Sequence, residues 1–394
     1  MMRNYKFRLY PTREVEQKLV ETLEINRVVY NYFVSSNLRS RNDMNYALTE
    51  LKERQPILRK YHSKMLQMVS TKVAAAWRAL EVLEEHGRRT GSLKFCKPGK
   101  CNSFTYNQSG FRIENDKLWL LKIGSIKIVL HRQPTKVKQV MVVRQARKWY
   151  AVVTCEIAKS IFRFVDTRKS IGIDVGITKF AYDSDDHEID NPLFLSKMIR
   201  PLRRAQRKVS RRKRGSNNRK KAKSWVAHLY QRIANKRHDF LHKLSTEYAS
   251  KYDLIFLERL RISNMVKNHH VARHIMDSGW GTFKTMLEYK AKMVVGVGPA
   301  YTSINCSKCG NTVPKTLAVR LHRCNKCGLT LDRDYNASLN ILNEGLTTLP
   351  QGLREFTPVE IAPLLASVGV QARSLKQEAS LFKAQAIHSA ERSQ

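Results

Sequence analysis

Three acidic residues that lie far apart in the chain stand in contexts suited to metal-dependent chemistry. Asp174 lies inside the apolar run 171–176, where an ionised carboxylate is costly unless something pairs with it. Glu258 ends a second apolar run, 253–258, and Asp334 opens a segment with helical spacing. Each alone has an ordinary explanation, because an Asp at a helix start is more often a cap and a Glu at a strand end is usually solvated.

Taken together, the three match the order strand-Asp, strand-Glu, helix-Asp of RNase H-like nucleases. In such nucleases the carboxylates hold two Mg²⁺ ions, of which one activates the attacking water and the other stabilises the leaving 3′ oxygen. Asp332 competes with Asp334, and we expect only one of them to reach the metals, since residues two apart on a helix start point differently. Asp239 and Glu288 are outside candidates without motif support.

Four of the seven cysteines form two Cys-x-x-Cys pairs, each followed by a glycine. The pairs are Cys306 with Cys309 and Cys324 with Cys327, and fourteen residues separate them. Four thiolates suit a tetrahedral zinc ion, so the spacing predicts a zinc ribbon. A closed site of four cysteines is structural rather than catalytic. A redox role is the alternative, but neither pair has a thioredoxin-like context.

The charge of the chain predicts a polyanionic partner. Lys and Arg number 72 against 33 Asp and Glu, which gives a net charge of +39. Twelve of the twenty-one residues in 203–223 are basic, and a solvated face is the alternative explanation for this run. The residues expected to contact nucleic acid are Arg203, Arg204, Arg207, Lys208, Arg211, Arg212, Lys213, Arg214, Arg219, Lys220, Lys236 and Arg237.

A membrane partner is not expected. The sequence has no long uncharged apolar run, no basic amphipathic anchor and no lipidation signal. The N-terminus lacks the apolar segment of a signal peptide, so we expect a cytoplasmic protein rather than an exported one.

The elements that must position these residues fall into a helical, a β-rich and a mixed part. A strand at 4–10 precedes a helical module at 12–86, whose apolar stripe indicates core packing, and a basic turn-rich connector follows at 91–100. Alternation between 103 and 164 predicts a small antiparallel barrel or sandwich, which the strand at 4–10 could complete.

The second half of the chain reads as a mixed α/β part. A hairpin around Gly176 follows the polar linker 165–170, and we expect a surface loop at 261–279. The other expected elements are a helix continuing through Trp225 to Leu244, a helix at 280–292, a short strand at 294–297 and a helix opening at 331–342. The composition and weak patterning of residues 350–394 predict a mobile tail with a helix at about 371–388.

At this point the residues resemble a known family, TnpB, also called OrfB, which insertion sequences encode and which is related to the type V CRISPR effectors. The resemblance covers roughly 3–345 and rests on Gly172, Asp174 and Gly176, the run 235–244, Leu257 with Glu258, Ser278 to Trp280, the four cysteines, and Asp332, Asp334, Asn336 and Ala337. It implies an RNA-guided DNA endonuclease, in which a guide RNA from the element pairs with double-stranded target DNA beside a short adjacent motif.

The same resemblance implies a multidomain architecture of α+β and α/β parts. A wedge β-barrel would comprise 1–11 and 103–164, with a helical recognition lobe at 12–102 inserted into it. An RNase H-like (RuvC) domain would comprise 168–302 and 329–345, with the zinc ribbon inserted at 303–328 and a tail at 346–394. The resemblance carries the catalytic magnesium ligands over to Asp174, Glu258 and Asp334, and zinc to the four cysteines.

Two other classes of function stay open. A DNA-strand-transferring transposase would need a nucleophilic Tyr or a strand-transfer architecture, and no motif singles out one of the fifteen tyrosines. A binding-only regulator would need a broken carboxylate set, and this set is intact. The connector at 91–96 departs from the family's usual Pro-aromatic pattern, so the sequence does not predict the adjacent motif. It does not predict the oligomeric state either.

Overall fold

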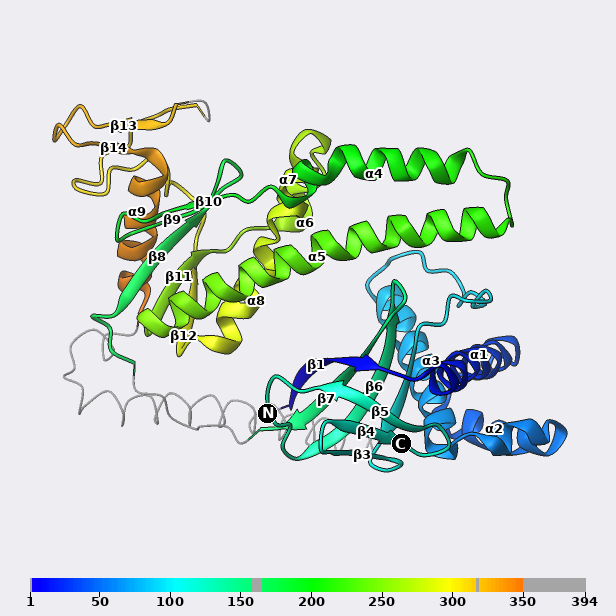
Figure 1. Ribbon diagram of the computed structural model, residues 1–394. Helices are drawn as coiled ribbons and strands as arrows, with labels where there is room; N and C mark the ends of the chain where they lie inside the picture. The colour runs from blue at the N-terminus through cyan, green and yellow to red at the C-terminus, as the bar shows by residue number, and fades with distance from the viewer. Residues whose placement is uncertain (1, 158–164, 317–318, 350–394) are drawn as a thin grey trace, which may run out of the picture. The chain divides into compact units, whose positions relative to one another are not determined.

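The computed structural model describes residues 2–157, 165–316 and 319–349. The chain divides into two compact units, Met1–Lys159 and Ser160–Gln394 (Figure 1). The tail predicted at 350–394, with its helix at 371–388, lies outside the described residues. Among the helices in the described ranges, none has the length and apolar character needed to cross a membrane.

The first unit contains one seven-stranded antiparallel sheet with the order β2-β6-β7-β1-β5-β4-β3. The strands are β1 (Met2–Tyr10), β2 (Ser103–Asn107), β3 (Phe111–Glu114), β4 (Lys117–Leu120), β5 (Gly124–Val129), β6 (Val137–Gln145) and β7 (Lys148–Glu156). The prediction that the N-terminal strand completes the β part is confirmed, because β1 pairs with β7 and β5. The expectation was an antiparallel barrel or sandwich, and no ladder joins β2 to β3 among the described strands, so hydrogen bonding does not close this sheet.

Between β1 and β2 the chain forms four helices, which confirms the predicted helical module. They are α1 (Arg13–Ser35), α2 (Arg41–Arg54), the 3₁₀ helix η1 (Pro56–Lys60) and α3 (Ser63–Glu85). Thr12 caps α1 by accepting a hydrogen bond from the amide of Val15. Leu19 and Phe33 on α1 and Val73 on α3 share one core with Phe104 on β2, so the apolar stripe is core packing, as predicted.

The second unit is built on a five-stranded sheet with the order β10-β9-β8-β11-β12. The strands are β8 (Ser170–Val175), β9 (Lys179–Asp183), β10 (Glu188–Asp190), β11 (Leu254–Glu258) and β12 (Met293–Val297). The strands β8, β9 and β10 form an antiparallel meander, whereas β8, β11 and β12 run parallel. The sheet is therefore mixed, and the strand that carries Asp174 lies at its centre.

Six helices in the described residues accompany this sheet. They are α4 (Phe194–Ser210), α5 (Asn217–Lys251), α6 (Ile262–Met265), α7 (His269–Ser278), α8 (Trp280–Lys290) and α9 (Arg333–Thr348). The surface loop expected at 261–279 was wrong, because this stretch forms α6 and α7. Asn268 caps α7 by accepting from the amide of His270 at 3.1 Å, and Ile275 is buried.

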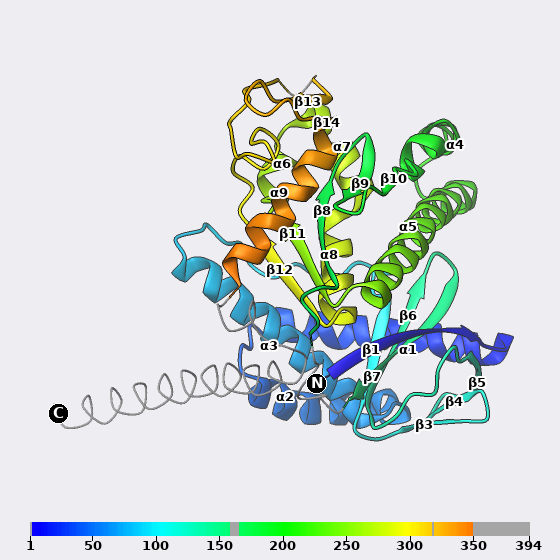
Figure 2. The same ribbon diagram turned by 90° about the vertical axis from the view of Figure 1, so that its left-hand side faces the viewer.

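Helices cover both faces of the sheet, which explains why its central strands are continuous apolar runs. On one face, Ile173 and Leu257 pack with Leu244 of α5 and Leu287 of α8. On the other face, Phe256 packs with Ile341 of α9. Figure 2 shows α9 crossing this second face of the sheet. The packing of α9 against the second face of the sheet fixes the position of this helix, whose first turn carries Asp334.

Two glycines allow α9 to approach the sheet closely. A Cβ atom on Gly172 would lie 2.3 Å from the backbone oxygen of Ser338, and one on Gly345 would lie 2.1 Å from Cδ1 of Phe256. We expect Gly172→Ala to lower the free energy of unfolding by about 1–3 kcal/mol, because the backbone of α9 must shift to make room. Urea unfolding measures this change.

Gly281 in α8 provides a matched control for that substitution. Its Cβ would come no closer than 3.4 Å to another atom, the Cδ1 of Ile262. Gly281→Ala should therefore leave the unfolding free energy within about 1 kcal/mol of the original, or raise it through helix propensity. Equal losses in both variants would show that the approach of α9 to β8 does not limit the fold.

Candidate active site and metal centre

The central parallel strands bring Asp174 and Glu258 to the same edge of the sheet. Leu257 on β11 is the register partner of Ile173 on β8, so the next residue of each strand is the carboxylate. The flanking apolar residues are buried on both faces, which fixes the backbone of both strands. Two acidic side chains 84 positions apart in the sequence are thus neighbours in the second unit.

The electrostatics of Asp174 identify its charged neighbours. Burial raises the pKa of the Asp174 carboxyl well above its usual range, and the charges of Glu258 and Asp334 raise it further. The guanidinium of Arg333 opposes this rise. Negative charges affect a pKa in this way only at short range. The three carboxylates predicted from the sequence therefore occupy one region.

Glu258 is held by a residue that the sequence did not single out. The hydroxyl of Thr302 donates to Oε1 of Glu258 at 2.5 Å, and Thr302 is buried. Burial raises the pKa of Glu258, the Thr302 hydrogen bond opposes this rise, and the nearby Glu344 carboxylate adds to it. Thr302 precedes the first cysteine pair in an irregular segment, so no periodic pattern marked it.

The beginning of α9 separates the roles of Asp332 and Asp334. Asp332 is the N-cap, and its Oδ1 accepts from the amides of Asp334 at 2.7 Å and Tyr335 at 3.3 Å. The Asp334 carboxylate instead accepts from Arg320 at 3.0 Å and from Arg333 at 2.8 Å. The charge of Asp334 also raises the pKa of Asp174. Asp332 thus performs the capping role expected of an Asp at a helix start.

Arg320 was not singled out by the sequence either, although it connects two parts of the site. One guanidinium nitrogen donates to Asp334, and the other donates to Thr178 at 2.8 Å, in the turn between β8 and β9. Arg320 lies between the two cysteine pairs, in the segment that leads into β13 (Leu321–Arg323). Its position in a turn-rich segment gave no signal, because the contact depends on how that segment folds.

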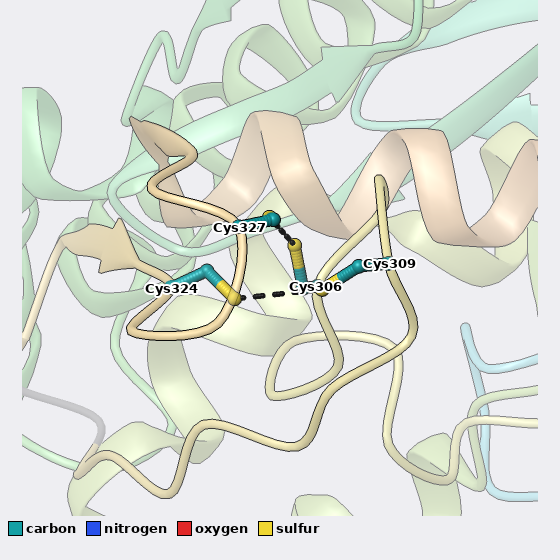
Figure 3. A group of neighbouring side chains, drawn as sticks. All are labelled: Cys306, Cys309, Cys324 and Cys327. Carbon is teal, nitrogen blue, oxygen red and sulfur yellow. Dashed lines mark hydrogen bonds between the residues drawn. The ribbon is translucent and has the colours of Figure 1, made fainter.

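The four predicted cysteines form a compact cluster (Figure 3). Their Sγ atoms all lie within 4.8 Å of one another, with Cys306 and Cys327 at 3.5 Å and Cys309 and Cys324 at 3.6 Å. Four thiols in this arrangement could hold a tetrahedral zinc ion. Among the described residues, the three carboxylates do not form such a group.

The two cysteine turns have the same backbone geometry. The amide of Gly310 donates to the carbonyl of Cys306 at 2.9 Å, and that of Gly328 donates to Cys324 at 3.0 Å. Both glycines adopt positive φ angles of 71° and 72°, which other residues rarely adopt. The amides of Cys327 and Lys326 lower the pKa of the Cys324 thiol to about 6, and hydrogen bonds from the Cys309 and Cys327 thiols add to this effect. Burial and the neighbouring thiols raise the pKa of Cys327 to about 12. The turn amides therefore favour the thiolate at Cys324, the form in which a cysteine binds metal.

Two asparagines of α9 attach the cysteine cluster to the acidic region. Asn336, fully buried, accepts from the amide of Ser307 at 3.0 Å and donates to the carbonyl of Asn305 at 2.8 Å. Asn340 donates to the carbonyl of Thr302 at 2.7 Å, and Thr302 holds Glu258. The segment that enters the cysteine cluster is thus joined to the carboxylates by a short chain of hydrogen bonds.

The predicted nucleic-acid contacts lie on α4, on α5 and in the turn between them. Ten of the twelve are exposed, whereas Arg219 and Arg237 are half-buried. Arg219 donates to the carbonyls of Val209 at 2.7 Å and Arg212 at 2.9 Å, so it closes the end of α4. Arg237 forms an ion pair with the buried Asp277. These two side chains have structural partners, and the other ten face solvent.

Comparisons with protein families match three parts of the chain. A family described as "Probable transposase", the OrfB family of IS605, matches residues 154–269. A family described as "Cas12f1-like, TNB domain" matches 280–341, which include the cysteine cluster. A family described as "Helix-turn-helix domain" matches 1–42, where the structure contains β1, α1 and the first residues of α2.

Two relatives extend this similarity over most of the chain. A Streptomyces pristinaespiralis protein named "Putative RNA-guided DNA endonuclease" is 33% identical over 366 residues, which cover 87% of this chain and 89% of the relative. The Escherichia coli protein "Putative RNA-guided DNA endonuclease InsQ" is 33% identical, over 67% of this chain and 71% of the relative. A solved mini-RNA-guided endonuclease, CRISPR-Cas_phi3, is 10% identical at a TM-score of 0.44, covering 89% of this chain and 93% of that structure.

Proposed function

Because the chain belongs to the TnpB (OrfB) family of insertion-sequence proteins, we propose that it is an RNA-guided DNA endonuclease that cuts at Asp174, Glu258 and Asp334. A guide RNA from the element would pair with the target strand, and the protein would read a short adjacent DNA motif. The observation that carries the proposal is the parallel register of β8 and β11, which makes Asp174 and Glu258 neighbours. The direction in which the charges of Glu258 and Asp334 shift the pKa of Asp174 agrees with this placement.

The proposed catalytic domain is RNase H-like. The strand order β10-β9-β8-β11-β12, with an antiparallel meander followed by two parallel strands, supports this assignment. The first unit would supply the wedge and the recognition lobe, from its sheet and its inserted helices respectively. The cysteine cluster between β12 and α9 would be a structural zinc ribbon.

The donor atoms of the two sites fit different metals. Carboxylate oxygens suit the hard ion Mg²⁺, and four thiolates suit zinc. Two Mg²⁺ ions held by Asp174, Glu258 and Asp334 would activate the attacking water and stabilise the leaving 3′ oxygen. The protein itself orients these ligands. Thr302 fixes Glu258, and Arg320 with Arg333 balances the charge of Asp334.

Tyrosine chemistry is not favoured at this site. Tyr182 is the ladder partner of Asp174, and its ring lies 5.5 Å from that of Tyr335. Burial raises the pKa of both phenols, and the hydrogen bond from Tyr182 to Asp186 adds to this rise in Tyr182. A raised pKa disfavours the phenolate that a nucleophilic tyrosine requires. The site therefore supports hydrolysis by water better than strand transfer through a tyrosine.

The raised pKa values predict how magnesium binding depends on pH. Only ionised carboxylates bind the metal, so Mg²⁺ binding should weaken as the pH falls through the raised pKa of Asp174, above the usual carboxyl range of about 4. In metal-free protein, the contribution of Asp174 to folding stability changes with pH in the opposite direction. A folded-state pKa above the unfolded value stabilises the fold at low pH, and this contribution is lost as the pH rises. Mg²⁺ should therefore raise the Tm more at about pH 8 than at about pH 5.5.

The control for this measurement is Asp174→Asn, which removes the titrating carboxyl while keeping its shape. This variant should show little Mg²⁺-induced rise in Tm at either pH. Equal Mg²⁺-induced shifts at both pH values in the original protein would exclude Asp174 as the group that controls metal binding.

Sequencing the RNA that co-purifies with the protein tests the partner. We expect one short RNA species with a constant segment derived from the end of the element. Recovery of mixed messenger RNA, or of DNA alone, would contradict the proposal of a guide RNA.

A further inference from the structure

Most of the hairpin formed by α4 and α5 carries charges of one sign only. From Asn191 to His238 the sequence contains seventeen Lys and Arg residues and not one Asp or Glu. The hairpin extends away from the sheet of its own unit (Figure 1). Positive charges without acidic neighbours in the same segment repel one another, and bound phosphates neutralise them. The counterions that the nucleic acid releases on binding favour the complex further. A polyanion is therefore the complementary ligand.

The basic residues of α4 and of the turn that follows it form a stripe. Arg204, Arg207 and Lys208 lie on one face of α4, and they line a surface hollow together with Arg211 and Arg212 just after the helix. Guanidinium groups bind phosphate oxygens in a bidentate manner. The stripe thus matches a run of successive phosphates on one strand.

A second groove beside the stripe contains an aromatic ring. Lys208 of α4 and Arg212 of the following turn line it together with Lys221 and Trp225 of α5. The helix expected through Trp225 is present, but the structure leaves the Trp225 side chain 56% exposed, and Leu229 and Ile233 form the buried face of α5. The Trp225 ring stacks with His228 at 5.3 Å and 23°, which orients the indole on the surface of α5.

We propose that this groove binds an unpaired segment of RNA, with the phosphates on the α4 stripe and one base stacked on Trp225. The proposal rests on the proposed function, in which RNA is the resident partner. Unpaired RNA bases are free to stack on aromatic side chains, whereas the bases of duplex DNA are already stacked within the helix. The exposed indole supplies a face for a base, and the flanking lysines and arginines supply the charge.

Binding of RNA-free protein to a labelled, unstructured RNA of about 12 nucleotides tests the site. Trp225→Ala should weaken binding about tenfold, and Trp225→Phe should retain most of the affinity, because any aromatic face can stack on a base. Tyr230→Ala should bind like the original protein, since Tyr230 lies on the same helix, is 47% exposed and lies outside the groove.

The salt dependence separates the stacking contact from the phosphate contacts. Removing one phosphate contact lowers the slope of log Kd against log salt by about 0.7 for single strands. Arg211→Ala combined with Arg212→Ala should therefore lower the slope by about 0.7–1.4, whereas Trp225→Ala should leave it unchanged. An unchanged affinity of Trp225→Ala at an unchanged fold, judged by its Tm, would overturn the proposal. A lower Tm with unchanged RNA affinity would also overturn it, since that result assigns Trp225 to packing.

Matched probes test the choice of RNA. A blunt RNA duplex should bind equally to the original protein and to Trp225→Ala, because it offers no free base. Single-stranded DNA of the same sequence should bind more weakly than the RNA, and equal losses for DNA and RNA at equal affinity would overturn the assignment to RNA. Guide-directed cleavage is scored separately. If the original protein does not cleave but its RNA affinity depends on Trp225, only the proposed nuclease activity is contradicted. If cleavage is normal and Trp225→Ala leaves the RNA affinity unchanged, only the proposed RNA groove is contradicted.

Discussion

Replacing Asp174 with alanine is expected to lower the rate of DNA cleavage by about 10³-fold or more, because a metal ligand at the reacting phosphate supplies several kcal/mol of transition-state stabilisation. Asp174 lies near the end of the central strand β8, and the charges of both other carboxylates raise its pKa. The substitution removes a half-buried carboxyl group and leaves the apolar packing of β8 intact, so the fold should persist. RNA and DNA affinities should stay within about twofold, since ten predicted contacts lie on the exposed hairpin.

Glu288→Gln provides the matched control, because Glu288 is an exposed carboxylate on α8 with a weak ion pair to Lys284 at 3.9 Å. Its cleavage rate should equal that of the original protein. Both variants are compared in single-turnover cleavage at saturating Mg²⁺, with binding measured in parallel. Unimpaired cutting by Asp174→Ala would reject the proposed carboxylate site, and a parallel loss of binding would show that the variant is misfolded.

Replacing Cys309 with serine is expected to abolish metal binding by the cluster and to lower the yield of folded protein. Metal binding by small zinc domains contributes on the order of 10 kcal/mol to folding, so the loss of one thiolate is costly. The loss of zinc should also lower the rate of DNA cleavage. The segment around the cluster supplies Thr302 to Glu258 and Arg320 to Asp334. Protein that does fold without zinc should therefore cut at least about tenfold more slowly.

Cys96→Ser is the control for this prediction, since Cys96 is a free thiol in the first unit, outside the cluster. It should retain one zinc per chain and normal cleavage. Zinc content is measured on purified protein by atomic emission, and folded yield by gel filtration. A Cys309→Ser variant with normal yield and no bound metal would show that the cluster is not a structural zinc site.

The sheet of the second unit was largely predictable from the sequence. The runs that contain Asp174 and Glu258 are apolar throughout because helices cover both faces of the sheet, so they read as buried strands. Their juxtaposition depends on the parallel register of β8 and β11, which a linear pattern does not contain. Resemblance supplied that step, and the register then placed the two carboxylates side by side.

The residues that orient the carboxylates could not be predicted. Thr302 and Arg320 lie in segments without periodicity, and their roles arise from the path of the chain around the cysteines. The choice of Asp334 over Asp332 came from resemblance, because either residue could begin the helix, and the N-cap role of Asp332 agrees with that choice. The exposure of Trp225 was not predictable either, because tertiary packing decides which face of α5 is buried.

Guide-directed cleavage is the most direct test of the central proposal. The purified protein with its RNA is mixed with two plasmids that differ only in the segment matched by the guide, with Mg²⁺ or with EDTA. We predict that only the matched plasmid is cut, that exchanging the guide segment moves the cut to the other plasmid, and that EDTA stops both reactions. Cutting that ignores the guide, joined strand-transfer products, or binding of the matched plasmid without cleavage would contradict the account.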